Sequence, residues 1–233
     1  MKRSEINEII ADSHAFIRQH GHHLPPFANW TPADWAGKGD EVDEIRTHSL
    51  GWDITDFGSG DFKRRGLVLF TLRNGEPASL ATGRGKLYAE KLMIVDPGQV
   101  TPLHFHWHKT EDIIVRAGGD LIVQLYVPTP TGGLGEEDVV VSVDGTRHVI
   151  EAGGSVTLGP GESISVPDHV YHTFTASRGR VLAGEVSLVN DDANDNRFYD
   201  EVGRFPVIEE DERPLHYLTA DYPTRSQVAI DGS

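Results

Sequence analysis

The stretch 98–119 reads GQVTPLHFHWHKTEDIIVRAGG and decides how the rest of the chain is interpreted. His104 and His106 stand two residues apart on an apolar, β-type background, so both imidazoles point to the same face of a strand. Glu111 follows five residues after His106, a gap in which the chain can turn and return a carboxylate to the two rings. These donors predict a metal site that still lacks one protein ligand.

A second stretch, 159–176, reads GPGESISVPDHVYHTFTA and supplies that ligand in His172. Three imidazoles and one carboxylate suit a first-row divalent ion and leave coordination positions open, whereas a closed structural zinc site would favour thiolates. Ordinary histidines satisfied by backbone partners are the alternative. The agreement of two separate stretches in residue type and order favours the metal.

The two stretches resemble the two motifs of the cupin superfamily. The first motif matches at every position, namely Gly98, His104, His106, Glu111 and Gly118. The second matches at Gly161, Pro167 and His172, but His169 replaces its glycine and Ala176 its final asparagine. The resemblance implies a mainly β fold, the cupin (double-stranded β-helix or jelly-roll) barrel, and leaves the turn geometry around His169 open.

Composition narrows the class of protein. The 233 residues are enough for one β-rich domain, and the absence of cysteine excludes disulfides and thiolate ligands. A formal net charge of −15 opposes binding to nucleic acid or anionic membranes, and the one short basic run is 63–65. With no apolar stretch of membrane-spanning length and no signal-peptide pattern, we expect a cytoplasmic protein.

The apolar patterning predicts three segments in one domain. Segment 1–48 is helical, with a helix over 4–20 that has Ser4 as N-cap and stops at Gly21. Segment 49–189 is the barrel, and 190–233 is a tail expected to cover the pocket. Turn signals such as Asn74-Gly75 and Gly118-Gly119 separate the β-prone runs, which are 50–57, 65–73, 87–95, 112–117, 120–127, 138–143, 147–151, 155–158, 163–167, 170–176 and 180–189.

Several polar segments are interpreted as loops. The insertion 128–137, PTPTGGLGEE, is expected to be exposed to solvent. The acidic clusters 190–196 and 209–212 are read as solvated loops rather than as calcium sites.

Ionisable residues near the two motifs indicate chemistry rather than metal storage. Lys109 and Asp112 flank Glu111, and Lys91 lies on the run that leads into the first motif. Glu185 interrupts an apolar run, where an unpaired carboxylate is costly, so we expect it to face the cavity. A carboxylate and an ammonium group beside a metal suit proton transfer between adjacent carbon atoms.

The strings HFHWHKTEDII, AEK, EVSLVNDD, GRFP and IEEDE are similar to those of the D-lyxose isomerase family of cupin sugar isomerases. This resemblance implies interconversion of D-lyxose and D-xylulose, and of D-mannose and D-fructose. It implies Mn²⁺, with Zn²⁺, Fe²⁺, Co²⁺ or Ni²⁺ as alternatives, and a homodimer. By this resemblance, His104, His106, Glu111 and His172 are expected to bind the metal. Acid–base or substrate-orienting roles are expected for Lys109, Lys91, Glu201 and Arg204.

The expected reaction passes through a cis-enediol, with Glu111 or Glu185 as the base and Lys109 moving the hydroxyl proton. Glu185 is preferred, because a coordinated Glu111 is a weak base. Asp112 and Lys91 are expected to bind substrate, and Glu201 with Arg204 to close the pocket. An Fe(II) cupin oxygenase and a non-catalytic sugar-binding cupin remain alternatives, which turnover of aldoses without oxygen would exclude.

Overall fold

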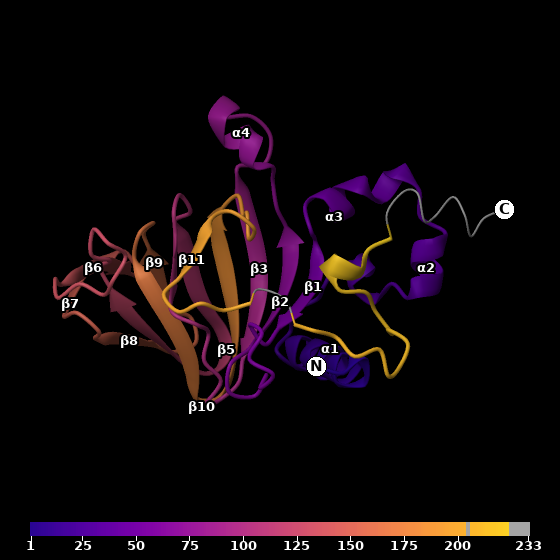
Figure 1. Ribbon diagram of the computed structural model, residues 1–233, viewed down its shortest axis with the longest axis horizontal. Helices are drawn as coiled ribbons and strands as arrows, with labels where there is room; N and C mark the ends of the chain where they lie inside the picture. Colours follow the sequence, from indigo (N-terminus) through magenta and orange to yellow (C-terminus); the bar gives the residue numbers. More distant parts are fainter. Residues whose placement is uncertain (204–205, 224–233) are drawn as a thin grey trace.

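A barrel built on two long strands dominates the structure, a computed structural model that describes residues 1–203 and 206–223. Strands β5 (Glu111–Tyr126) and β10 (Tyr171–Leu188) pair antiparallel over most of their length. The strands follow one another in the order β1-β2-β3-β10-β5-β9-β6-β7. Outside this order, β4 pairs with β10 and β11, and β8 pairs with β5. Both groups of strands contribute to one apolar core, so the strands enclose a barrel (Figure 1). The mainly β barrel expected from the sequence is confirmed.

The other strands are short and mostly coincide with the β-prone runs of the sequence. They are β1 (Gly51–Thr55), β2 (Leu67–Arg73), β3 (Tyr88–Val95), β4 (His104–His106), β6 (Val139–Val143), β7 (Thr146–Ile150), β8 (Ser155–Leu158), β9 (Ser163–Val166) and β11 (Asn196–Phe198). The sequence does not predict β4 and β11 as separate strands. Each has three residues, too few for a recognisable pattern, and pairing with the other and with β10 holds them in place.

The breaks expected at 118–119 and between 176 and 180 are bends within β5 and β10 rather than turns between strands. Gly118 has a φ of +93°, and a Cβ at this position would lie 2.1 Å from the Arg180 carbonyl oxygen. The register between the two strands shifts at the same level, which is how a bulge bends a sheet. The glycine therefore lets two bent backbones approach closely, and the long strands can pass through both halves of the barrel.

The sheet that contains β2 has two buried faces. Leu67 and Leu69 point into the barrel core, whereas Val68 and Phe70 belong to a second apolar layer outside it. This alternation follows from the two-residue period of a strand. It also fixes which positions of β3 and β10 face the interior, and Lys91 and Glu185 are among them, in step with Met93 and Ala183.

Helix α1 (Arg3–Gln19) covers the outer apolar layer (Figure 1). Ile6, Ile10 and Ile17 recur at helical spacing and are almost fully buried, each contributing roughly 1.5–3 kcal/mol through burial. The helix expected over 4–20 is confirmed, but Ser4 is not its N-cap. Ser4 lies inside the first turn, and its hydroxyl donates a hydrogen bond of 2.8 Å to Asp211 instead.

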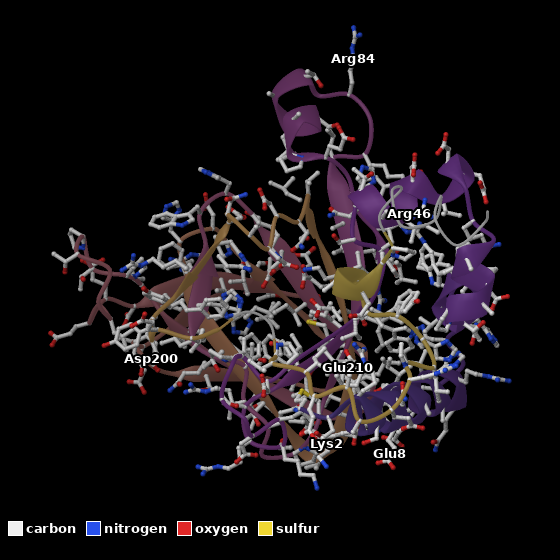
Figure 2. The ribbon with its side chains drawn as sticks, turned by 45° about the vertical axis from the view of Figure 1, so that its right-hand side comes forward. Lys2, Glu8, Arg46, Arg84, Asp200 and Glu210 are labelled. Carbon is white, nitrogen blue, oxygen red and sulfur yellow. The ribbon has the colours of Figure 1, made fainter. Side chains whose placement is uncertain are left out.

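Short helices complete the first third of the chain and one hairpin. They are η1 (Pro26–Asn29), α2 (Pro32–Ala36), η2 (Asp40–Val42), α3 (Asp43–Thr47) and α4 (Pro77–Thr82). The break expected at Asn74-Gly75 is present, since β2 ends at Arg73, and these residues open an excursion that contains α4 and projects from the body, with Arg84 near its tip (Figures 1 and 2). Within the part of the chain that is described, no helix has the length and apolar character needed to span a bilayer.

The described end of the chain runs along α1 and ends in η3 (Thr219–Asp221). The Met1 amino group donates to the Val207 carbonyl over 2.9 Å, and Arg3 pairs with both Glu210 and Asp221. Lys2 and Glu210 are labelled at this contact in Figure 2. The cluster 209–212 is thus not merely a solvated loop, since two of its carboxylates hold the start of α1.

The insertion 128–137 is less exposed than the sequence suggests. Tyr171 Oη donates a hydrogen bond of 2.9 Å to the Gly132 carbonyl, and residues 132–135 are half-buried. A Cβ at Gly132 would lie 2.3 Å from Nη2 of Arg197, so the loop packs directly against β11.

Candidate functional site

Three imidazoles converge inside the barrel where β4 pairs with β10. His104 lies directly opposite His172 in the strand register, and their ring centroids are 4.2 Å apart. His106, two residues further along β4, points to the same side. One ligand nitrogen of each ring lies within 4.8 Å of those of the other two.

Hydrogen bonds to the backbone fix the orientation of two of these rings. His104 Nδ1 lies 2.8 Å from the Pro102 carbonyl, and His172 Nδ1 lies 3.0 Å from the Val170 carbonyl. Because a carbonyl can only accept, each Nδ1 carries the proton, and Nε2 of the neutral ring presents a lone pair. The buried Nε2 atoms of His106 and His172 have no hydrogen-bond partner. Buried imidazole nitrogens that converge on one point and have no hydrogen-bond partner are what a metal site requires.

Glu111 lies beside two of the three rings and offers a carboxylate as a further donor. Strand β4 ends at His106 and β5 begins at Glu111, so the chain turns between them as the spacing predicts. The Glu111 oxygens lie 3.0 Å from His172 Nε2 and 3.2 Å from His106 Nε2. Lone pairs and carboxylate oxygens facing one another at these distances fit a bound divalent cation, for which three nitrogens and one oxygen suit a first-row metal.

Burial keeps these rings in the form that binds a metal. It holds the pKa of His104 well below the ordinary range of imidazole, helped by the neighbouring His172 and His106. Burial also lowers the pKa of His106, as does the Lys109 ammonium. Burial alone would raise the pKa of Glu111, but Lys109 and His106 bring it well below the usual carboxyl range. At neutral pH the neutral forms of His104 and His106 and the ionised form of Glu111 predominate.

Two lysines and a second carboxylate adjoin the histidines. Lys91 on β3 lies opposite Glu185 on β10 in the register, with Nζ 3.2 Å from Oε1. Lys109 Nζ lies 2.8 Å from Glu185 Oε1 and 2.8 Å from Glu111 Oε2. All four residues are at most 5 % exposed. Two cations and two anions therefore alternate inside the barrel, which offsets much of the cost of burying each charge.

The charges stay ionised because they face one another. Burial by itself would lower the pKa of Lys109, but the Glu111 and Glu185 carboxylates raise it overall. Burial would likewise raise the pKa of Glu185, yet Lys109 and Lys91 lower it. The site thus holds the Lys109 ammonium group and the Glu185 carboxylate side by side at neutral pH.

A cavity opens beside these groups. Its polar wall includes His104, Glu111, Lys91 and Glu185. Its apolar wall comes from the barrel core and from β11, and includes Phe57, Leu69, Phe174 and Phe198. Asp192 and Asn196, from the segment expected to cover the pocket, also line it. An apolar cavity with a few converging polar groups is typical of small-molecule sites.

The other residues predicted for substrate binding are not gathered here. Asp112 is exposed on the outer side of β5, because it follows Glu111 by one residue and a strand turns successive side chains to opposite faces. Glu201 is exposed and does not line the cavity. The expectation that Asp112 faces the site is therefore wrong. Arg204 lies outside the described residues.

The sequence analysis missed Asn190, whose side chain contacts both lysines. Its Oδ1 accepts a hydrogen bond of 2.6 Å from Lys91 and lies 3.4 Å from Lys109 Nζ. The composition of the cluster 190–196 predicts a solvated loop. What could have pointed to Asn190 in the sequence is its position directly after the strand that carries Glu185.

His169 occupies the position of the cupin motif glycine and adopts a backbone conformation that favours glycine. Its φ is +55°, in the left-handed region, and its N–H donates a hydrogen bond of 2.9 Å to the His106 carbonyl. The imidazole stacks on Phe105 with ring centroids 5.4 Å apart and an interplanar angle of 25°. The turn beside His172 is thus kept, and stacking offsets the strain that a side chain introduces there.

A β-barrel whose interior holds a histidine cluster, two carboxylates and two lysines beside a cavity defines a cupin-type enzyme site. The D-lyxose isomerase family matches residues 1–222. The D-lyxose/D-mannose isomerases of Serratia proteamaculans and Escherichia coli O157:H7 are 47 % and 46 % identical to the chain over 225 residues, covering 95 % of it and 98 % of each relative. The chain therefore belongs to the D-lyxose isomerase family, and the prediction of a sugar isomerase is confirmed.

Solved structures agree on the fold. The L-ribose isomerase of Cellulomonas parahominis with L-ribose matches with a TM-score of 0.60 at 20 % identity, over 90 % of this chain and 98 % of that one. The enzyme of Acinetobacter sp. DL28 in complex with L-ribose matches with the same TM-score and coverage at 17 % identity. The cupin barrel with an N-terminal helix is thus a fold shared with other sugar isomerases.

Proposed function

We propose that this aldose–ketose isomerase interconverts D-lyxose with D-xylulose and D-mannose with D-fructose. The relatives that cover nearly the whole chain are named for both aldoses. D-Lyxose and D-mannose have the same configuration at C2, C3 and C4. A site that recognises the substrate through the hydroxyl groups on these carbons therefore accepts either sugar. The observation that carries the proposal is the buried Glu185, held by Lys91 and Lys109 beside the histidine cluster.

His104, His106, His172 and Glu111 would hold the metal, for which Mn²⁺ is our choice. The support is their convergence and the orphaned imidazole nitrogens. A bound divalent ion would supply Lewis-acid stabilisation of negative charge on the sugar oxygens. Isomerisation needs no redox change, so the same donors serve equally with Zn²⁺, Co²⁺ or Ni²⁺.

Glu185 is the proposed base and Lys109 the group that moves the hydroxyl proton. Glu185 removes the proton from C2 of the open-chain aldose, and the released electron pair forms the C1–C2 double bond as Lys109 protonates O1. The enediol then gives its O2 proton back to Lys109, C2 becomes the carbonyl, and Glu185 delivers its proton to C1. Lys91 holds the carboxylate from the other side, 3.2 Å away, and keeps it ionised between turnovers.

Glu111 is the weaker candidate for the base. Lys109 and two imidazoles surround its oxygens, so its lone pairs are already engaged. A glutamate that binds a metal and an ammonium group at once has little affinity left for a proton.

Anaerobic incubation of Mn²⁺-loaded protein with D-lyxose and D-mannose tests the reaction class. Ketose formation without oxygen is the expected result, and an oxygen requirement would instead support a cupin oxygenase.

In D₂O, solvent deuterium should appear at C1 of the ketose. Complete retention of the C2 hydrogen would indicate a hydride shift and remove the role assigned to Glu185.

The assembly and cellular location are further parts of the proposal. We infer a homodimer, as the family resemblance implies, which sedimentation equilibrium would test against a monomer of 25.6 kDa. We also infer a cytoplasmic location, supported by a chain without cysteine. Cell fractionation with an antibody to the tagged protein would check it.

A further inference from the structure

The side chain of Asn190 contacts both lysines of the site. It lies just beyond the end of β10 and reaches back so that its Oδ1 accepts from Lys91 at 2.6 Å. The same oxygen is 3.4 Å from Lys109 Nζ. One neutral acceptor thus contacts both ammonium groups that hold Glu185.

The backbone of Asn190 is itself held by a second asparagine. Asn190 N–H donates to Asn74 Oδ1 over 3.0 Å, and Asn74 Nδ2 donates to the Asn190 carbonyl over 3.0 Å. Asn74 is 5 % exposed, and its Oδ1 also accepts from the Gly75 N–H at 2.9 Å. This paired contact joins the start of the α4 excursion to the end of β10 and leaves the Asn190 side chain little freedom.

Counting donors shows what Asn190 adds. The Lys109 ammonium has three protons and three acceptors within reach, on Glu111, Glu185 and Asn190. Lys91 has two of these acceptors, Glu185 and Asn190, and its third proton remains for the cavity that it lines. Without Asn190, each ammonium would have only carboxylate acceptors and could swing toward them.

We propose that Asn190 is a positioning residue, whose amide oxygen ties Lys91 and Lys109 into one rigid unit around Glu185. This inference rests on the proposed isomerase function. An amide suits the position because it accepts hydrogen bonds without adding charge, and the two lysines already balance Glu111 and Glu185. If either ammonium group moved, the Glu185 carboxylate or the proton of Lys109 would no longer be correctly placed relative to the substrate. A misplacement of about 1 Å can cost roughly 10²-fold in rate.

The test compares Asn190→Leu, which keeps the branched shape without an acceptor, with Asn190→Asp, which keeps an acceptor oxygen of the same geometry. Asn194→Leu is the matched control, because Asn194 lies in the same loop and its amide bonds Asp191 rather than a lysine. For each variant we would measure kcat and KM on D-lyxose, bound metal, and the rate at which reductive methylation modifies Lys91 and Lys109.

For Asn190→Leu we expect kcat to fall about 10- to 100-fold with unchanged metal content and little change in KM. Lys91 should be methylated faster than in the wild type. Asn190→Asp should recover part of the lost kcat, and Asn194→Leu should match the wild type in every measurement. A purely structural role would lower the melting temperature without changing the labelling of Lys91 or separating kcat from KM.

Wild-type kcat and wild-type lysine labelling in Asn190→Leu would overturn the inference. If the wild type itself shows no aldose turnover, the proposed function fails, and the labelling comparison still decides whether Asn190 positions the lysines. The two failures are therefore distinguishable.

Discussion

Two clusters of charged residues hold this chain together at different places, and they are built differently. Outside the barrel, Arg3 makes four hydrogen bonds with the carboxylates of Glu210 and Asp221, at 2.7 to 3.2 Å. Inside it, Lys91 and Lys109 share the single oxygen Oε1 of Glu185. The first cluster has one cation for two carboxylates, whereas the second has two cations for two carboxylates and borders a cavity.

The difference lies in what each cluster leaves unsatisfied. The planar guanidinium of Arg3 is matched to two carboxylates, so its donors are almost fully used within the protein. The barrel cluster adjoins imidazole nitrogens without partners and an ammonium with a spare proton. A structural cluster satisfies its own groups, whereas a site keeps some groups free for a ligand.

Removing a metal ligand is the strongest way to test this contrast. His172→Ala deletes one of the converging nitrogens, so we expect loss of bound metal and of essentially all isomerase activity. The Arg3 cluster is remote from the change, and α1 and its tail should stay packed. Metal analysis and turnover check the site, and the circular-dichroism spectrum checks the fold.

Chelation gives the matched measurement on the unaltered chain. Activity should disappear with a chelator and return when Mn²⁺ is added. Full turnover by metal-free protein would refute the assignment of the histidine cluster.

Glu185→Gln should have the next largest effect. The amide keeps the shape but cannot take a proton from carbon, so kcat should fall roughly 10²- to 10⁴-fold while metal content is unchanged. Steady-state kinetics on D-lyxose with metal analysis provide the measurement. Glu90→Gln, on the outward face of β3, is the control and should behave as wild type. A loss below about threefold for Glu185→Gln would shift the base to another residue.

The sequence predicts the position of the three histidines and Glu111 better than the rest of the site, for a physical reason. His104, His106 and Glu111 lie in one short stretch, where the strand period and one turn determine their relative positions. His172 required only that two strands be neighbours. Asp112 is next to Glu111 in the sequence, but successive side chains of a strand point to opposite faces. Its side chain therefore lies on the outer face of β5, away from the site.

The parts of the fold that could not be predicted depend on long-range contacts. Asn190 approaches the lysines only because Asn74, 116 residues earlier, holds its backbone. The acidic run near Glu210 has the composition of a solvated loop, and only the position of Arg3 gives it a partner. Local patterns determine strands and donors, but they do not report which distant loop covers them.

Arg3→Met tests the structural cluster and should affect stability rather than chemistry. Losing charged hydrogen bonds at a buried position should lower the free energy of unfolding by about 1–3 kcal/mol. Chemical denaturation gives this value, and kcat should remain close to that of the wild type. Lys2→Met, which removes an exposed partner of Asp211 at 3.9 Å, is the control expected to change little. A large loss of kcat in correctly folded Arg3→Met would mean that the two clusters are coupled.

The smallest expected effect is a pH dependence of the same structural contact. The hydrogen bond from Arg3 lowers the pKa of Glu210, more than burial raises it. A carboxyl group with a lowered folded-state pKa contributes stability that is fully present above its unfolded value of about 4.3 and is lost as pH falls through the lowered pKa. Other carboxylates titrate in the same range, so the useful quantity is the difference in melting temperature between wild type and Glu210→Gln. This difference should be largest near neutral pH and shrink below pH of about 4.3, because protonation makes the wild-type side chain resemble the amide. A difference that stays constant from neutral to acidic pH would show that Arg3 holds the tail through Asp221 alone.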